Sequence, residues 1–249
     1  MQRPPLLSRR ALLGAAALPF LGGCSTPLPL AATPAGDPAA AARLQESAEV
    51  HGLAAYRRIT DINIAYDGQW RPLIDRIQPA VVDAGYRGSS QERLMPAAGI
   101  VAQAYTGPRG AKQVRWQREA AGRRSAVAVW RNGVPDETPD ALDAAALVAE
   151  GYGLFPLGPL WLVDRRLPMR MAGTERVDGR LCDVVDVWLA PGLGRSALDR
   201  VAVCIDRADG ITRRVRFTLE GTVNTKGAVA EVDTFEHARH FGVLWPMRS

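Results

Sequence analysis

The cysteine at position 24 is the residue whose chemistry is set most clearly by its neighbours. It ends the run Leu21-Gly22-Gly23-Cys24, behind a basic start and an apolar middle, within the first two dozen residues. Two small residues before a thiol let a diacylglycerol be attached to the sulfur before the peptide is cut in front of it. We therefore predict a cleaved export signal over residues 1–23 and a lipid on Cys24.

The same segment resembles the signal of a bacterial lipoprotein. Leu21, Gly22, Gly23 and Cys24 match a lipobox at all four positions, and Arg9-Arg10 resembles a twin-arginine motif. The thirteen residues 11–23 would make a helix about 20 Å long, too short for a hydrocarbon core of about 30 Å. The remaining alternative is a plain signal peptide with an accidental cysteine.

The resemblance implies that the protein is localised in the bacterial cell envelope. Ser25 follows the cysteine where an Asp would favour the inner membrane, so we expect lipid anchoring in the outer membrane, facing the periplasm. Residues 24–37, rich in Pro, Ala and Thr, are expected to form the lipidated N-terminus and a flexible tether. The membrane is then a partner through the N-terminal lipid alone.

The charge balance argues against a nucleic-acid partner. The net charge is +5, but residues 1–23 contain three arginines and no acidic residue, so the rest of the chain is close to neutral.

Three histidines leave few bases for catalysis, and Ser89-Ser90 lacks the G-x-S-x-G context of a hydrolase. His237 and His240 lie three apart on an expected strand, which puts them on opposite faces as solvated residues. We expect no catalytic residue, no metal and no cofactor, and so not an enzyme.

Cys182 and Cys204 are the candidates for a disulfide. They lie eleven residues on either side of Leu193, within a loop expected over residues 191–195. A symmetric hairpin places them directly opposite each other, with Cα atoms about 4.5 Å apart at a non-hydrogen-bonded pair. Two cysteines outside the cytoplasm favour pairing. The alternative is a pair of small buried hydrophobic residues.

An uncharged segment, residues 152–162, is the candidate for binding an apolar ligand. Its two glycines and two prolines argue against one regular helix or strand. An apolar loop must line a cavity, contact a membrane or fold back on the core, so the alternatives are a cavity mouth and a buried connection. Trp116 and Trp130, on neighbouring expected strands, either line the same cavity or belong to the core. The ligand candidates are Tyr152, Leu154, Phe155, Leu157, Leu160, Trp161, Trp116 and Trp130.

Changes in hydrophobic period predict the fold. Asp37-Pro38 is expected to start a helix over residues 39–55, and further helices are expected over 72–83 and over 141–150, the last stopping near Gly151 or Gly153. Strands are expected over 59–66, 86–94, 100–105, 111–118, 125–130, 170–176, 181–189, 200–207, 212–220 and 228–235. This predicts one α+β or mainly β domain over 38–249. Its form would be a large curved antiparallel sheet or incomplete β-barrel of roughly ten strands, with two or three helices packed on one side.

The order of these elements is similar to that of the LolA/LolB superfamily of lipoprotein carriers. The likeness covers residues 40–249 and rests on topology and on turns such as Asp178-Gly179 and Asp209-Gly210. Members fold as an incomplete barrel capped by helices, with acyl chains held in between, and the resemblance implies the same architecture and an apolar cavity here. We expect a lipid-anchored envelope protein that binds an acyl chain, lipid or lipidated protein. The alternative is a structural or regulatory lipoprotein that acts through protein–protein contacts.

Overall fold

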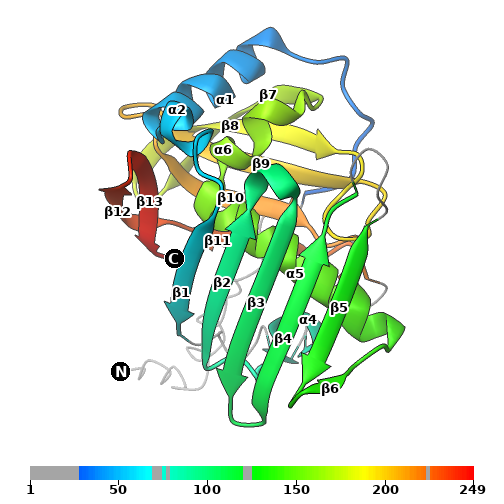
Figure 1. Cartoon of the computed structure of the whole chain (residues 1–249). Coiled ribbons are helices and arrows are strands. Elements are labelled where there is room, and N and C mark those ends of the chain that lie inside the picture. Colours follow the sequence, from blue (N-terminus) through cyan, green and yellow to red (C-terminus); the bar gives the residue numbers. More distant parts are fainter. Residues whose placement is uncertain (1–27, 69–74, 77–78, 120–124, 223–224) are drawn as a thin grey trace, which may run out of the picture.

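The computed structural model describes residues 28–68, 75–76, 79–119, 125–222 and 225–249, and it contains two antiparallel sheets with a long helix between them (Figure 1). The expected signal segment, Cys24 and the start of the tether lie outside these ranges. Part of the helix expected over 72–83 also lies outside them, and its described end is α4 (Pro79–Val82).

Sheet 1 has six strands that follow one another in chain order, each antiparallel to the next. Directly paired residues share a face, so Leu94, Val101 and Trp116 form one row on the inner face. Ala104, Gln113 and Trp130 form a row on the outer face, which is turned toward the viewer in Figure 1. The strands are β1 (Ile62–Asp67), β2 (Ser89–Met95), β3 (Ile100–Gly107), β4 (Gly110–Gln117), β5 (Ala126–Arg131) and β6 (Val134–Pro135).

Sheet 2 has five strands in the order β11-β10-β9-β8-β7, and a separate two-stranded hairpin closes the chain. Every residue of β9 is buried, because this central strand is covered on both faces. The strands are β7 (Met169–Val177), β8 (Arg180–Leu189), β9 (Asp199–Asp206), β10 (Thr212–Thr218) and β11 (Val229–Asp233), and the hairpin is β12 (Phe235–His240) with β13 (Val243–Arg248).

The first helix begins where the sequence predicts and ends earlier. α1 (Pro38–Val50) is capped by the Asp37 carboxylate, which accepts a hydrogen bond from the Ala39 amide at 2.9 Å. Gly52 has a φ of 93°, a conformation that suits glycine, and there the chain turns into α2 (Leu53–Tyr56).

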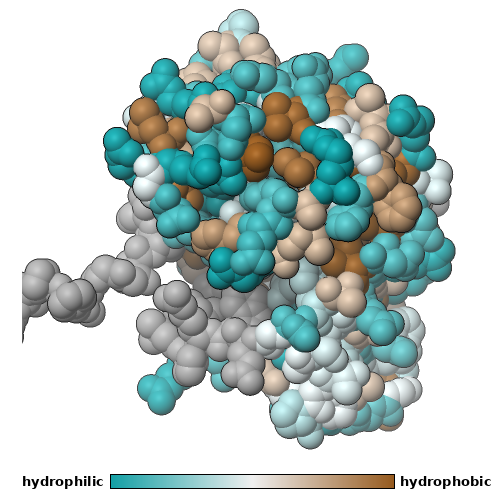
Figure 2. Space-filling model, turned by 90° about the vertical axis from the view of Figure 1, so that its left-hand side faces the viewer, coloured by the Kyte–Doolittle hydropathy of each residue, from teal (hydrophilic) through white to brown (hydrophobic). Residues whose placement is uncertain are grey.

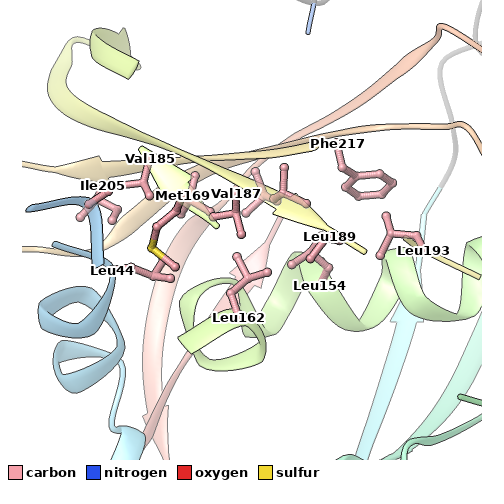
Figure 3. Close-up of a cluster of buried hydrophobic side chains, with 14 of the residues drawn as sticks. Leu44, Leu154, Leu162, Met169, Val185, Val187, Leu189, Leu193, Ile205 and Phe217 are labelled. Atoms are coloured by element: carbon pink, nitrogen blue, oxygen red, sulfur yellow. The ribbon is translucent and has the colours of Figure 1, made fainter. Parts of the chain in front are cut away.

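The long helix α5 (Pro139–Leu157) lies between the two sheets and contributes to the core on each side. Leu147 and Leu154 join a cluster with sheet 2, whereas Ala149 and Leu157 join a cluster with the inner face of sheet 1. Figure 3 shows the sheet 2 side, where Leu154 and Leu162 point toward Val187 and Leu189. The short helices are α6 (Pro159–Leu162), η1 (Pro96–Ala98) and η2 (Val163–Arg165).

The predicted fold class is confirmed in its main features. The sheets are antiparallel and do not close into a barrel, and few helices accompany them. Two details differ. The β-structure is divided between two sheets and a hairpin, and α5 lies between the sheets, because each of its sides carries apolar residues.

Candidate functional site

A row of aromatic rings crosses from sheet 1 to sheet 2 over α5. The ring centroids of Tyr66 on β1 and Tyr152 on α5 lie 6.1 Å apart, and those of Tyr152 and Phe155 also lie 6.1 Å apart. Phe155 then contacts Phe217 on β10 at 5.0 Å. Tyr66, Tyr152 and Phe155 are half-buried, so the row is partly exposed to solvent. We call these four residues the aromatic row.

Residues 152–162 are helical and not a loop, which corrects that part of the expectation, but they do not form one regular helix, as predicted. α5 continues through Tyr152 to Leu157, with Pro156 inside it, and the chain breaks at Gly158 before α6. Gly151 and Gly153 do not stop the helix. A Cβ at Gly151 would lie 2.8 Å from Cζ of Phe217, and one at Gly153 would lie 3.1 Å from Cδ2 of Leu94, so both glycines allow close packing against the sheets.

The expected ligand residues divide into two groups. Leu154, Leu157, Leu160 and Trp116 are at most 2% exposed and belong to the core, which supports the alternative of a buried connection for them. Tyr152, Phe155 and Trp161 are half-buried. Trp161 lies between the guanidinium groups of Arg118 and Arg165, at 4.6 and 3.4 Å from the ring centroid.

Trp116 and Trp130 do not line one cavity. Trp116 pairs with Val127 on the inner face of sheet 1, whereas Trp130 pairs with Gln113 on the outer face. The prediction that the two residues lie on neighbouring strands is correct. The expected shared cavity is wrong, because side chains alternate between the two faces of a sheet and these two residues face opposite sides. Trp130 instead lines a hollow of about 520 Å³ on the solvent side of the sheet.

A group of buried and half-buried polar side chains lies around Tyr152 on the inner side of sheet 1. The Arg87 guanidinium faces the rings of Tyr105 and Tyr152 at 4.7 and 4.9 Å and donates to the Tyr152 hydroxyl at 2.9 Å. Glu92 accepts from Gln103 at 2.9 Å, and burial raises the pKa of its carboxyl to about 7. We call these residues, Arg87, Glu92, Gln103, Tyr105 and Tyr152, the polar cluster.

Several atoms of the polar cluster lack hydrogen-bond partners. They are Nε of Arg87, Oε1 of Glu92, Oε1 of Gln103 and the hydroxyl of Tyr105. A buried polar atom without a partner costs roughly 1–3 kcal/mol, so these atoms mark a place where a polar part of a ligand or a water would be favoured. This cluster was not predicted from the sequence. The sequence feature that could have indicated it is that Glu92 and Gln103 lie two residues from the core residues Leu94 and Val101 on their strands, and therefore face the same side of the sheet.

His51 and His237, which are far apart in the sequence, face each other. Their rings are 6.1 Å apart and nearly perpendicular, and burial lowers the pKa of His51 to about 4. His237 is half-buried and His240 is exposed, so the expectation of two solvated histidines holds for His240 alone. Among the residues that the structure describes, no group of three or more His, Cys, Asp or Glu side chains could hold a metal ion.

The expected disulfide is absent, and both cysteines are free and buried. The observed register pairs Cys182 with Asp206 and Cys204 with Val184. The hairpin is therefore centred on Gly194 and not on Leu193 as expected. Moving the centre by one residue changes the cross-strand partner of each cysteine by two positions. Diagonal neighbours of this kind lie about 7–8 Å apart, beyond disulfide range. Burial raises the pKa of the two thiols to about 11 and about 12.

The outside of the molecule gives two further observations. The side that carries β1, β12 and β13 shows a group of hydrophobic residues surrounded by hydrophilic ones (Figure 2). Across the described ranges no single helix is long and apolar enough to cross a membrane. α5 and residues Pro159–Arg165 reach that length and composition only as a pair bent by 118°.

Comparison with known proteins gives distant structural likenesses alone. No protein family and no curated protein matches the sequence. The lipoprotein LppX of Mycobacterium tuberculosis is 14% identical, with a TM-score of 0.32 over 79% of this chain and 92% of LppX. LprF of Mycobacterium bovis is 12% identical, with a TM-score of 0.33 over 86% of this chain and 96% of LprF. A DUF1329 family protein of Desulfovibrio piger is 8% identical, with a TM-score of 0.42 over 82% of each chain.

The structural neighbours include a mycobacterial lipoprotein. With every TM-score below 0.5, none of the three assigns the chain a family, a ligand or a partner.

Proposed function

We propose that this chain is a lipid-anchored protein of the bacterial cell envelope that binds an apolar ligand between its two sheets, at the aromatic row. The ligand class is an acyl chain, a lipid or a lipidated protein. Cys24 carries the anchor in this proposal, residues 1–23 are removed, and the body faces the periplasm from the outer membrane.

The observation that carries the proposal is that the aromatic row connects the two sheets through α5 and is partly exposed to solvent. Tyr66 belongs to sheet 1, Phe217 to sheet 2, and Tyr152 and Phe155 to the helix between them. Half-buried aromatic side chains already lie partly in water, so an acyl chain placed on them removes further apolar surface from solvent. Each buried CH₂ contributes about 0.8 kcal/mol.

The polar cluster gives this site a polar wall. The Tyr152 ring faces Phe155 on one side and the Arg87 guanidinium on another. Apolar sites usually hold a small number of polar groups that fix the orientation of the ligand. An amphiphile with its chain along the aromatic row would place its polar end near the unpartnered atoms of Arg87 and Glu92.

A second candidate function is a scaffold lipoprotein that acts through protein–protein contacts. The observation that favours it is the filled space around α5, where Leu154, Leu157 and Leu160 are at most 2% exposed. In this case the helix is a permanent part of the core.

The two candidates are separated by binding of a fluorescent fatty acid to the delipidated protein. The aromatic row predicts saturable binding that Phe155→Asp weakens at least tenfold, because a charge opposes the apolar chain. Val134→Asp, at a residue 65% exposed on β6, adds the same charge away from the row and should bind normally. Circular dichroism checks that both variants fold.

Wild-type protein that binds no apolar probe, while gentle purification from membranes yields a stoichiometric partner protein, would contradict ligand binding and favour the scaffold. Native mass spectrometry of the same preparation detects a co-purifying lipid directly.

A further inference from the structure

We propose that the outer face of sheet 1 binds a linear glycan of uncharged pyranose rings in the hollow next to Trp130. The hollow is a shallow depression that is open to solvent, with a volume of about 520 Å³. Most of its lining residues face outward from sheet 1, away from α5, and no described element covers this face of the sheet in Figure 1. The proposal is therefore independent of the apolar-ligand site.

One row of side chains crosses the hollow at right angles to the strands. The register places Ala65 beside Gln91, Gln91 beside Ala104, Ala104 beside Gln113 and Gln113 beside Trp130. All five line the hollow, and the first four are exposed while Trp130 is half-buried. Because neighbouring strands are about 4.8 Å apart, the row is about 19 Å long.

Three alanines with small side chains form the base of the hollow and leave space above the sheet. Ala65, Ala102 and Ala104 all face outward and line it. Alanine is depleted in strands, where larger β-branched or aromatic residues are more stable, so two outward alanines on β3 and a third on β1 reduce sheet stability. They leave the space that larger side chains would fill, with Gln91, Gln113 and Trp130 standing higher around them.

The side chains of the row match the two kinds of surface on a sugar ring. A glutamine amide offers two N–H donors and a carbonyl acceptor, which suits hydroxyl groups that both donate and accept. The face of an indole ring and the methyl groups of alanine suit the C–H face of a pyranose. Gln91 and Gln113 are two strands apart, about 10 Å, which is close to the length of two linked pyranose rings.

The absence of charge along the row favours an uncharged ligand. None of the five residues of the row is ionisable. Arg93, which also lines the hollow, is held by a bidentate ion pair with Asp61, with Nη2 2.6 Å from Oδ2 and Nε 3.0 Å from Oδ1. An acidic polymer would require this pair to open, whereas a neutral glycan leaves it intact.

The test is titration of the full-length purified protein with β-1,4-linked hexamers of N-acetylglucosamine and of glucose, followed by tryptophan fluorescence and calorimetry. We expect saturable binding of at least one series. Trp130→Ala should weaken it at least tenfold, and Ala104→Tyr, which fills the floor, should abolish it. Thr106→Tyr adds the same bulk on the same face of β3 at a residue that does not line the hollow, and it should bind as wild type does.

Ala104→Tyr keeps the test decisive if Trp130→Ala fails to fold. The proposal is overturned if neither hexamer binds to the wild type, or if Ala104→Tyr binds as well as Thr106→Tyr. It is also overturned if Ala104→Tyr splits a wild-type dimer in analytical ultracentrifugation, because the hollow is then covered by a second copy of the chain.

Discussion

Trp116 and Trp130 lie on adjacent strands and point to opposite sides of sheet 1. Trp116 is 1% exposed and packs with Leu94 and Val101 against the helices, whereas Trp130 faces solvent beside Gln113. Sheet 1 therefore has an inner face that packs in the core and an outer face that is exposed to solvent.

The stability of the two tryptophan variants should differ accordingly. Trp116→Ala leaves a cavity in the core and should lower the free energy of unfolding by about 3–5 kcal/mol. Trp130→Ala removes a half-buried side chain and should cost less than about 1 kcal/mol. Urea denaturation followed by circular dichroism measures both. Equal losses in the two variants would contradict the assignment of faces.

A second prediction concerns the contact of Gly151 with Phe217. Alanine is better than glycine inside a helix by about 0.5–1 kcal/mol, so Gly151→Ala would stabilise a helix that had free space. A Cβ there lies 2.8 Å from the ring, and the ring must shift within a packed core. We therefore expect Gly151→Ala to lower the melting temperature despite its higher helix propensity. A rise in melting temperature would show that α5 is not tightly packed on β10.

The carboxyl of Glu92 should make stability depend on pH. Burial raises its pKa from 4.5 in the unfolded chain to about 7, so between these values the folded protein holds the extra proton. The contribution of Glu92 to the free energy of unfolding therefore decreases as the pH rises through this window, by at most about 3 kcal/mol.

The matched comparison for this effect is Glu92→Gln, which resembles the protonated form at every pH. The free energy of unfolding of Glu92→Gln minus that of wild type, measured by urea denaturation, should be larger at pH 8 than at pH 5. A stability difference that is the same at both pH values would mean that Glu92 is hydrated in the folded protein.

Local signals in the sequence predicted the local structure well. Asp37-Pro38 begins α1, and Asn132-Gly133 forms the turn before β6 with φ values of 51° and 79°. Alternating apolar residues placed most strands within a few positions. These features are determined by residues that are adjacent in the chain, and they can therefore be predicted from local sequence patterns.

Features set by distant partners could not be predicted in the same way. Gly151 and Gly153 resemble helix stops until Phe217 and Leu94 are known to pack against them. The pairing of Cys182 with Asp206 depends on a loop whose centre is one residue away from its apparent middle. The polar cluster joins residues from β2, β3, α5 and the loop before β2 that share no motif, and its unpartnered atoms become visible in three dimensions alone.

The last prediction concerns the anchor. If Cys24 carries the lipid, Cys24→Ser should move the protein from the membrane fraction to the soluble fraction, because burial of the attached acyl chains is what holds it there. Ser25→Ala, next to it, keeps the thiol and should stay with the membranes. Fractionation with a high-salt wash measures both, and mass spectrometry of the wild-type N-terminal peptide detects the acyl groups. A Cys24→Ser protein that still sediments with membranes after the wash would contradict the anchor and require another membrane-binding surface, for which the apolar group on the side of β1, β12 and β13 is the next candidate.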